Sequence, residues 1–199
     1  GLGMGKLGLM DRPKDTPGKQ ACAAVGQCEL MYLYDNLFSE YSITVAQLLL
    51  TKYILLEDRR KNVENALERL ISQGVIPVVN ENDTVAIDEL ELEMGENDSL
   101  AAVVATIANA DLLIIMSDID GLYDSDPRQN PDAKMIPVVR EISEDIHAVA
   151  GGAGTKFGTG GMATKIHAVE IAYESDIDVV LMNGQHPKKL YELFEDKPK

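Results

Sequence analysis

The sequence predicts an α/β sandwich with a mostly parallel sheet. Short apolar runs of strand length alternate with longer segments whose apolar residues recur at helical spacing. Glycine, proline and charged residues separate these segments, and neither a long linker nor an internal repeat interrupts them. This alternation is typical of a parallel sheet covered by helices, so we expect one continuous domain over residues 1–199.

The first half of the chain is predicted to hold two helices and two strands. Pro17 to about Tyr41 is mainly helical in pattern, and a β-rich run follows from Ile43 to Leu50. The second helix ends at Gly74, where a C-terminal cap is expected. Val75 to Val79 is almost wholly apolar, which is typical of a parallel strand covered on both faces. The apolar face of the second helix is formed by Val63, Ala66, Leu67, Leu70 and Ile71.

The second half repeats the alternation of helix and strand. Ser99 to Asn109 is predicted as a helix, and the apolar strand Asp111 to Met116 follows it. Met162 to Tyr173 is the next helix, and Asp178 to Met182 is the last strand. Each half therefore supplies strands and helices to the same α/β class.

Composition and charge exclude several classes of protein. The chain is 45% hydrophobic and 26% charged, which is ordinary for a globular protein, and its apolar runs are far shorter than the roughly 20 residues that a bilayer requires. A net charge of −15 repels nucleic acid and anionic lipid, so neither is expected as a partner. Cys22 and Cys28 form no CxxC pair and are interpreted as small core residues, which favours a cytoplasmic location. The histidines lack metal-ligand spacing and are not expected to bind a metal: His147, His167 and His186.

Polar side chains follow two of the predicted strands. Asn80-Glu81-Asn82-Asp83 comes after Val79, and Ser117-Asp118 comes after Met116. In open α/β sheets, ligands bind beyond the carboxyl ends of the strands, where helix N-termini also point their N–H groups. The sequence therefore predicts one binding site at this edge of the sheet.

A glycine-rich segment, Gly158 to Lys165, enters the predicted helix at Met162. Glycines let several backbone N–H groups turn toward an anion, the start of a helix adds a favourable dipole, and Lys165 supplies a mobile charge. The segment is not a Walker A loop, because its lysine follows Ala163-Thr164 instead of a glycine. Taken alone, it is equally compatible with a glycine-rich turn that carries a surface lysine.

Two clusters of amide and carboxylate side chains, residues 80–83 and Glu96 to Ser99, suit an amino-acid ligand. Carboxylates can hold an α-ammonium group, and amides can donate to carboxylates. Turn and capping roles would also explain Asn97, Asp98 and Ser99, and capping and ligand binding can coexist.

Together these motifs resemble the glutamate 5-kinase family of the amino acid kinase superfamily, over essentially the whole chain. The resemblance implies a three-layer α/β/α sandwich, ATP and Mg²⁺ as cofactors, and glutamate as the phosphoryl acceptor in the first step of proline biosynthesis. The motifs that carry it occur in the family's order: Val78 to Val85, Gly95 to Asp98, Ser117 to Tyr123, Asp126-Pro127-Arg128 and Gly158 to Lys165.

The resemblance also assigns roles position by position. Asp83 and Asn97 resemble glutamate-binding residues, and Asn80 is expected to shape the substrate loop with Glu81. Lys165 is expected to neutralise the γ-phosphoryl oxygens in the transition state and Asp98 to orient lysines, so these two are the predicted catalytic residues. The predicted nucleotide-binding residues are Ser117, Asp118, Thr159, Gly160, Gly161, Met162, Ala163, Thr164 and Lys165. No residue is assigned as a metal ligand.

The sequence departs from the family pattern in three places. The family's first strand, its lysine-containing phosphate loop and a Ser-Ser-Gly-Ala stretch have no counterpart here, so we expect the natural protein to begin upstream of Gly1. Glu96 stands where the family usually has Asp. A C-terminal RNA-modification-type domain, present in many members, has no counterpart before Lys199.

The resemblance further suggests a homo-oligomer, feedback inhibition by proline, and handover of the product to glutamyl phosphate reductase. Two alternatives stay open. One is another amino acid kinase that acts on aspartate, acetylglutamate or a nucleoside monophosphate, and the other is a non-catalytic module that binds glutamate or nucleotide. The two polar substrate loops favour glutamate, since a basic uridylate pocket is not evident.

Overall fold

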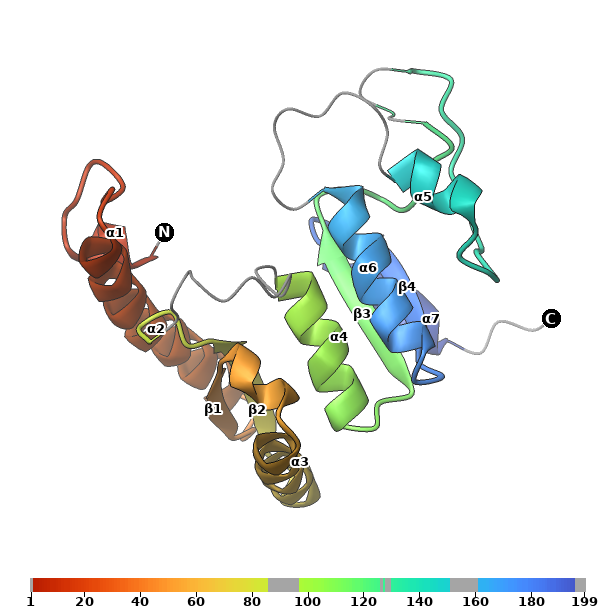
Figure 1. The fold of residues 1–199 in the computed structure, drawn as a ribbon. Coiled ribbons are helices and arrows are strands. Elements are labelled where there is room, and N and C mark those ends of the chain that lie inside the picture. The colour runs from red at the N-terminus through yellow and green to blue at the C-terminus, as the bar shows by residue number, and fades with distance from the viewer. Residues whose placement is uncertain (1, 86–96, 126, 128–129, 151–160, 196–199) are drawn as a thin grey trace. The chain divides into compact units, whose positions relative to one another are not determined.

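The computed structural model describes residues 2–85, 97–125, 127, 130–150 and 161–195 (Figure 1). The chain divides into two compact units, Gly1–Asn97 and Asp98–Lys199. In each unit the described strands form a two-stranded parallel sheet, β1–β2 in the first and β3–β4 in the second. The predicted α/β class and the parallel strand pairing are therefore confirmed.

The first unit places two long helices beside its sheet. Its sheet pairs Val45 with Ile76 at one end and Leu50 with Glu81 at the other. α3 ends as the sequence predicts, because Gly74 has a φ of 72° and the N–H of Val75 donates to the carbonyl of Leu70 at 3.0 Å. The elements of this unit are α1 (Leu2–Lys6), α2 (Thr16–Ser39), β1 (Val45–Leu50), the 3₁₀ helix η1 (Lys52–Leu55), α3 (Glu57–Ser72) and β2 (Ile76–Glu81).

The short helix α1, which the sequence did not predict, packs closely on α2. A Cβ atom at Gly3 would lie 1.8 Å from the carbonyl oxygen of Cys22, so only glycine permits this approach. Lys6 Nζ lies 2.8 Å from Glu29 Oε1, and this hydrogen bond and charge raise the pKa of Lys6. Cys28 is exposed, so its interpretation as a core residue is wrong, because α2 turns this position toward solvent.

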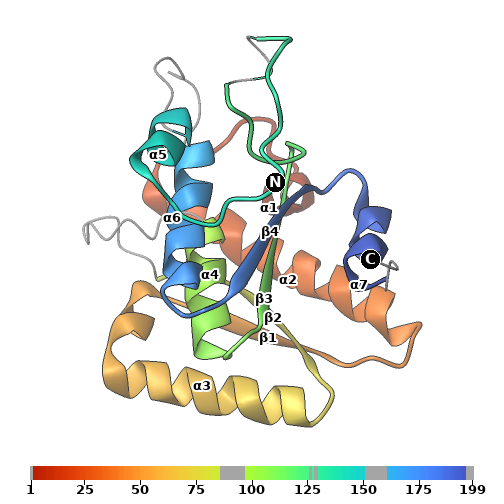
Figure 2. The same cartoon turned by 90° about the vertical axis from the view of Figure 1, so that its right-hand side faces the viewer.

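The second unit packs α4 and α6 against its sheet (Figures 1 and 2). Its register runs from Leu112 opposite Asp178 to Ser117 opposite Asn183. The elements are α4 (Asn97–Ile107), β3 (Leu112–Ser117), α5 (Glu144–Ala150), α6 (Met162–Tyr173), β4 (Asp178–Asn183), the 3₁₀ helix η2 (Pro187–Lys189) and α7 (Leu190–Phe194). The core between these elements is formed by Ala102, Ala105, Leu113, Ile115, Ala168, Ala172 and Ile177.

The topology of the second unit brings two helix N-termini to one edge. α4 leads through a short connection into β3, and α6 leads in the same way into β4, so both helices run opposite to the strands that follow them. Because β3 and β4 are parallel, their carboxyl ends lie at the same edge as the N-termini of α4 and α6. This is the edge at which the sequence predicts a binding site.

Among the described residues, none of the helices combines the length and the apolarity that crossing a bilayer requires.

Leu67→Ala should lower the free energy of unfolding by about 2–4 kcal/mol, because truncating a buried leucine leaves a cavity. Leu67 of α3 is 1% exposed, whereas Ile71, one turn later on the same helix, is 53% exposed. Ile71→Ala is therefore the matched control and should change the same free energy by less than about 1 kcal/mol. Urea denaturation followed by circular dichroism measures both variants. Equal losses would show that Leu67 is not a core residue.

Candidate active site

A largely buried ion pair lies at the helix N-termini of the second unit. Lys165 stands in the first turn of α6 and Asp98 in the first turn of α4. Their side chains are 10% and 23% exposed, and Lys165 Nζ lies 3.0 Å from Asp98 Oδ2. The two residues are 67 positions apart in the sequence, so the packing of α4 beside α6 brings them together.

The placement of these charges has an electrostatic consequence. A helix N-terminus carries a partial positive charge, which favours Asp98 at the start of α4 and disfavours Lys165 at the start of α6. The carboxylate of Asp98 offsets this unfavourable position, and the hydrogen bond fixes the ammonium group in one place. The result is a positioned cation at the strand ends, as electrostatic stabilisation of a phosphoryl group requires.

The chain beyond β3 is anchored beside this pair of helices. The carbonyl of Ser117 accepts a hydrogen bond from the N–H of Gly184 at 2.8 Å, which continues the β3–β4 ladder past its last strand pair. The hydroxyl of Ser117 donates to Asp118 Oδ1 at 3.2 Å. Ser117 is therefore the last residue of β3, and Asp118 follows it directly at the predicted edge of the sheet.

The described part of the glycine-rich segment forms the start of α6. Gly161 is the N-cap residue, and no side-chain hydrogen bond caps the helix among the described residues. Thr164 Oγ1 donates to the carbonyl of Gly161 at 2.8 Å, which ties the first turn together. Met162 is half-buried and Ala163 is exposed. Uncapped backbone N–H groups with a lysine one turn in fit a phosphate group, and so they fit ATP. Thr159 and Gly160 lie outside the described residues.

The predicted substrate residues Asn80 and Asp83 lie at the carboxyl end of β2, which runs two residues further than the sequence predicts. Asn80 lies in β2, and Asp83 is exposed in the turn after it. That turn is held by Asn82, whose N–H donates to the carbonyl of Leu50 at 2.7 Å and whose Oδ1 accepts from Thr84 Oγ1 at 2.6 Å. Asn97 is exposed where α4 begins. Glu96 lies outside the described residues.

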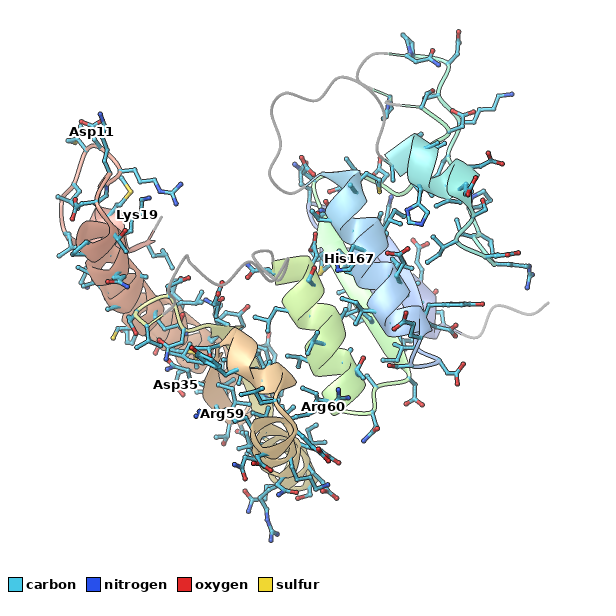
Figure 3. The ribbon with its side chains drawn as sticks, viewed as in Figure 1. Asp11, Lys19, Asp35, Arg59, Arg60 and His167 are labelled. Atoms are coloured by element: carbon cyan, nitrogen blue, oxygen red, sulfur yellow. The ribbon has the colours of Figure 1, made fainter. Side chains whose placement is uncertain are left out.

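Sequence reasoning missed two side-chain networks. Gln27 of α2 contacts both strands of the first sheet. The only feature of the sequence that could have indicated this contact is a polar residue on the helix face that meets the strands. In the second unit, Glu170 of α6 contacts two histidines: its Oε1 lies 3.0 Å from His147 Nε2 of α5, and its Oε2 lies 3.4 Å from His167 Nδ1. The first contact joins α5 to α6, and Figure 3 labels His167 on α6. Within the described part of the chain, no group of three His, Cys, Asp or Glu side chains is placed to hold a metal ion.

Comparison with known families gives a match over residues 4–183 to the amino acid kinase family. The chain belongs to the amino acid kinase family. Among curated relatives of this amino acid kinase, the glutamate 5-kinase of Clostridium perfringens is 52% identical over 197 residues, which cover 98% of this chain and 73% of the relative. The glutamate 5-kinase of Caldanaerobacter subterraneus is 53% identical over 186 residues, which cover 93% of this chain and 50% of the relative. The resemblance to glutamate 5-kinase is thereby confirmed, and the chain spans between half and about three quarters of these relatives.

Solved structures show the same fold at low sequence identity. Isopentenyl phosphate kinase of T. acidophilum matches with a TM-score of 0.57 and 19% identity, over 98% of this amino acid kinase and 75% of that chain. E. coli aspartokinase III matches with a TM-score of 0.58 and 18% identity, and the match covers 87% of this chain and 40% of the aspartokinase chain. The predicted amino acid kinase fold is therefore confirmed.

Asp98→Leu should lower the free energy of unfolding by roughly 1–3 kcal/mol, because it leaves the Lys165 ammonium buried without its carboxylate. Adding Lys165→Met to the same protein should restore part of that loss, since the double variant no longer buries a charge. Denaturant unfolding of both variants measures the difference.

The exposed ion pair Lys61–Glu64 supplies a control, because its side chains are 64% and 34% exposed. Lys61→Met should change the free energy of unfolding by less than about 1 kcal/mol. A double variant less stable than Asp98→Leu alone would show that the Lys165–Asp98 pair is not a coupled unit.

Proposed function

We propose that the protein to which this chain belongs transfers the γ-phosphoryl group of ATP to the γ-carboxylate of L-glutamate. The product is L-glutamyl 5-phosphate, and the reaction is the first step of proline biosynthesis. The observation that carries the proposal is the Lys165–Asp98 ion pair at the strand ends of an amino acid kinase that is 52% identical to a glutamate 5-kinase over 197 residues. The proposal treats the chain as one amino acid kinase domain of a cytoplasmic enzyme.

The chemistry needs positioned charge more than it needs a base. A glutamate side chain has a pKa near 4.3, so the attacking carboxylate is already ionised at neutral pH. One of its oxygens forms a bond to the γ-phosphorus, the bond between that phosphorus and the bridging oxygen breaks, and ADP leaves with the electron pair. The main barrier is the approach of two anions, which a fixed cation lowers. Lys165 is the catalytic cation in this proposal, and Asp98 holds its Nζ at 3.0 Å.

The residues proposed to bind the nucleotide belong to the second unit. The first turn of α6, from Gly161 to Lys165, offers backbone N–H groups and a cation to the phosphates. Thr159 and Gly160 complete the proposed phosphate loop, and Ser117 and Asp118 at the end of β3 face the nucleotide in the proposal. Mg²⁺ accompanies ATP on its phosphates and supplies further neutralisation of charge when bound.

The residues proposed to bind glutamate are Asp83 and Asn97, with Asn80 shaping the loop. An exposed carboxylate such as Asp83 suits the α-ammonium group of glutamate, and the amide of Asn97 can donate to a carboxylate. The product is an acyl phosphate that water hydrolyses readily, so we propose rapid handover to glutamyl phosphate reductase. Assembly as a homo-oligomer and feedback inhibition by proline complete the proposal.

A coupled ADP-release assay on the full-length natural protein tests the activity. ADP release should depend on glutamate and should be much slower with aspartate, N-acetylglutamate or a nucleoside monophosphate. A better rate with one of these acceptors would identify a different amino acid kinase. Glutamate and ATP binding without turnover in calorimetry would identify a non-catalytic module, and either result would overturn the proposed function.

Lys165→Met should lower kcat by roughly 100- to 1000-fold, because methionine has a similar length but lacks the positive charge that stabilises the transferring phosphoryl group. Circular dichroism should show an unchanged fold. Lys61→Met removes an exposed lysine of α3 and is the control that should retain the wild-type kcat. A Lys165→Met enzyme with more than half of the wild-type kcat would refute the catalytic role.

Asp83→Ala and Asn97→Ala should each raise the KM for glutamate far more than the KM for ATP, because both are assigned to the amino-acid side of the site. Both side chains are exposed, so their removal should leave the melting temperature nearly unchanged. Steady-state kinetics with each substrate varied in turn separates the two effects. Weakened ATP binding with unchanged glutamate binding in calorimetry would show that the division of the site is wrong.

A further inference from the structure

We infer that Gln27 of α2 is a positioning residue for glutamate binding. It acts by fixing the side-chain amide of Asn80, which lies in β2 just before the substrate loop. The inference rests on the proposed function. The observation behind it is a hydrogen-bond chain in the first unit that joins one helix to both strands of the sheet.

The chain of hydrogen bonds has a defined direction. Asn80 Nδ2 donates to Gln27 Oε1 at 3.1 Å, and Gln27 Nε2 donates to Gln47 Oε1 at 3.4 Å. Asn80 Oδ1 accepts from the backbone N–H of Glu81 at 2.9 Å. Both ends of the Asn80 amide are therefore engaged, so the amide has one preferred orientation.

The strand register explains why one helical residue reaches both strands. Leu49 of β1 lies opposite Asn80 of β2, and Gln47 is two residues before Leu49. Side chains two positions apart on a strand share a face, and partners in a parallel ladder point to the same side. Gln47 and Asn80 thus lie on one face of the sheet, and the half-buried Gln27 meets both from α2.

The position of Asn80 connects this network to the proposed substrate residues. Asn80 is followed directly by Glu81 and then by the turn at Asn82. The backbone N–H of Asn82 donates to the carbonyl of Leu50 at 2.7 Å, which fixes the start of this turn. Asp83, the proposed ligand of the α-ammonium group, stands in that turn. If the side-chain amide of Asn80 rotates, its Oδ1 no longer accepts the hydrogen bond from the backbone N–H of Glu81. The backbone that leads to Asp83 is then held less firmly.

Glutamine is the side chain that this place requires. Gln27 must accept from Asn80 and donate to Gln47 at the same time, and a neutral amide does both. Methionine has a similar length and can do neither, whereas glutamate can accept but cannot donate. Gln27→Met therefore removes the network with little change in side-chain volume.

The test is Gln27→Met in the full-length natural protein. The KM for glutamate should rise roughly 2- to 13-fold, the change that corresponds to one neutral hydrogen bond, while the KM for ATP and kcat stay within about twofold. Gln73→Met is the matched control: its glutamine is exposed at the end of α3, and its kinetics should equal those of the wild type. Calorimetric titration with glutamate should show the same weakening as the KM.

A double variant separates positioning from a merely structural role. If Gln27 acts through Asn80, Gln27→Met should add little to the glutamate KM of an Asn80→Ala enzyme. The inference would be overturned if the increases in glutamate KM from the two single variants multiplied in the double variant. It would also be overturned if Gln27→Met raised the KM for glutamate and the KM for ATP equally. A wild-type glutamate KM in the Asn80→Ala enzyme would overturn it as well. In each of these cases the wild-type enzyme would still phosphorylate glutamate, whereas absent glutamate turnover in the wild type would overturn the proposed function itself.

Discussion

The close packing of α4 and α6 on the β3–β4 sheet is the constraint on which the proposed chemistry depends. The core between them contains small side chains, including Ala102 and Ala168, which are fully buried and let the elements approach closely. This packing holds Lys165 Nζ 3.0 Å from Asp98 Oδ2. Because interiors deform little, the ammonium group stays where the strand ends and helix N-termini also converge.

The pairing of Lys165 with Asp98 reduces the destabilising effect of a buried cation at the position where the proposed mechanism needs one. A mostly buried cation at a helix N-terminus is unfavourable by itself, since both desolvation and the helix dipole oppose it. A carboxylate that forms a hydrogen bond with the ammonium offsets much of this penalty and also fixes its position. In the proposed mechanism this fixed cation stabilises an anionic phosphoryl group, and folding has already placed it before the substrates bind.

The first unit uses neutral groups for a related purpose. Its network of Gln27, Gln47 and Asn80 carries no net charge, so it orients a loop without attracting or repelling an anionic substrate. A helix, two strands and the following turn all take part in it. Each unit therefore has its own means of fixing polar groups: an ion pair in the second unit and an amide chain in the first.

The sequence alone determined the α/β class and the motifs typical of an amino acid kinase, because apolar periodicity and local chemistry depend only on the order of residues. It also predicted the three strands after residue 75 to within about two residues at each end. From the resemblance, the sequence also predicted Lys165 and Asp98 as catalytic residues, and this stays a prediction. Only the tertiary structure decided that their atoms meet, since the contact spans 67 positions and depends on how α4 and α6 pack. It likewise decided the exposure of Cys28 and the partners of Gln27. Such facts depend on which helical face meets the sheet, and long-range packing fixes that choice.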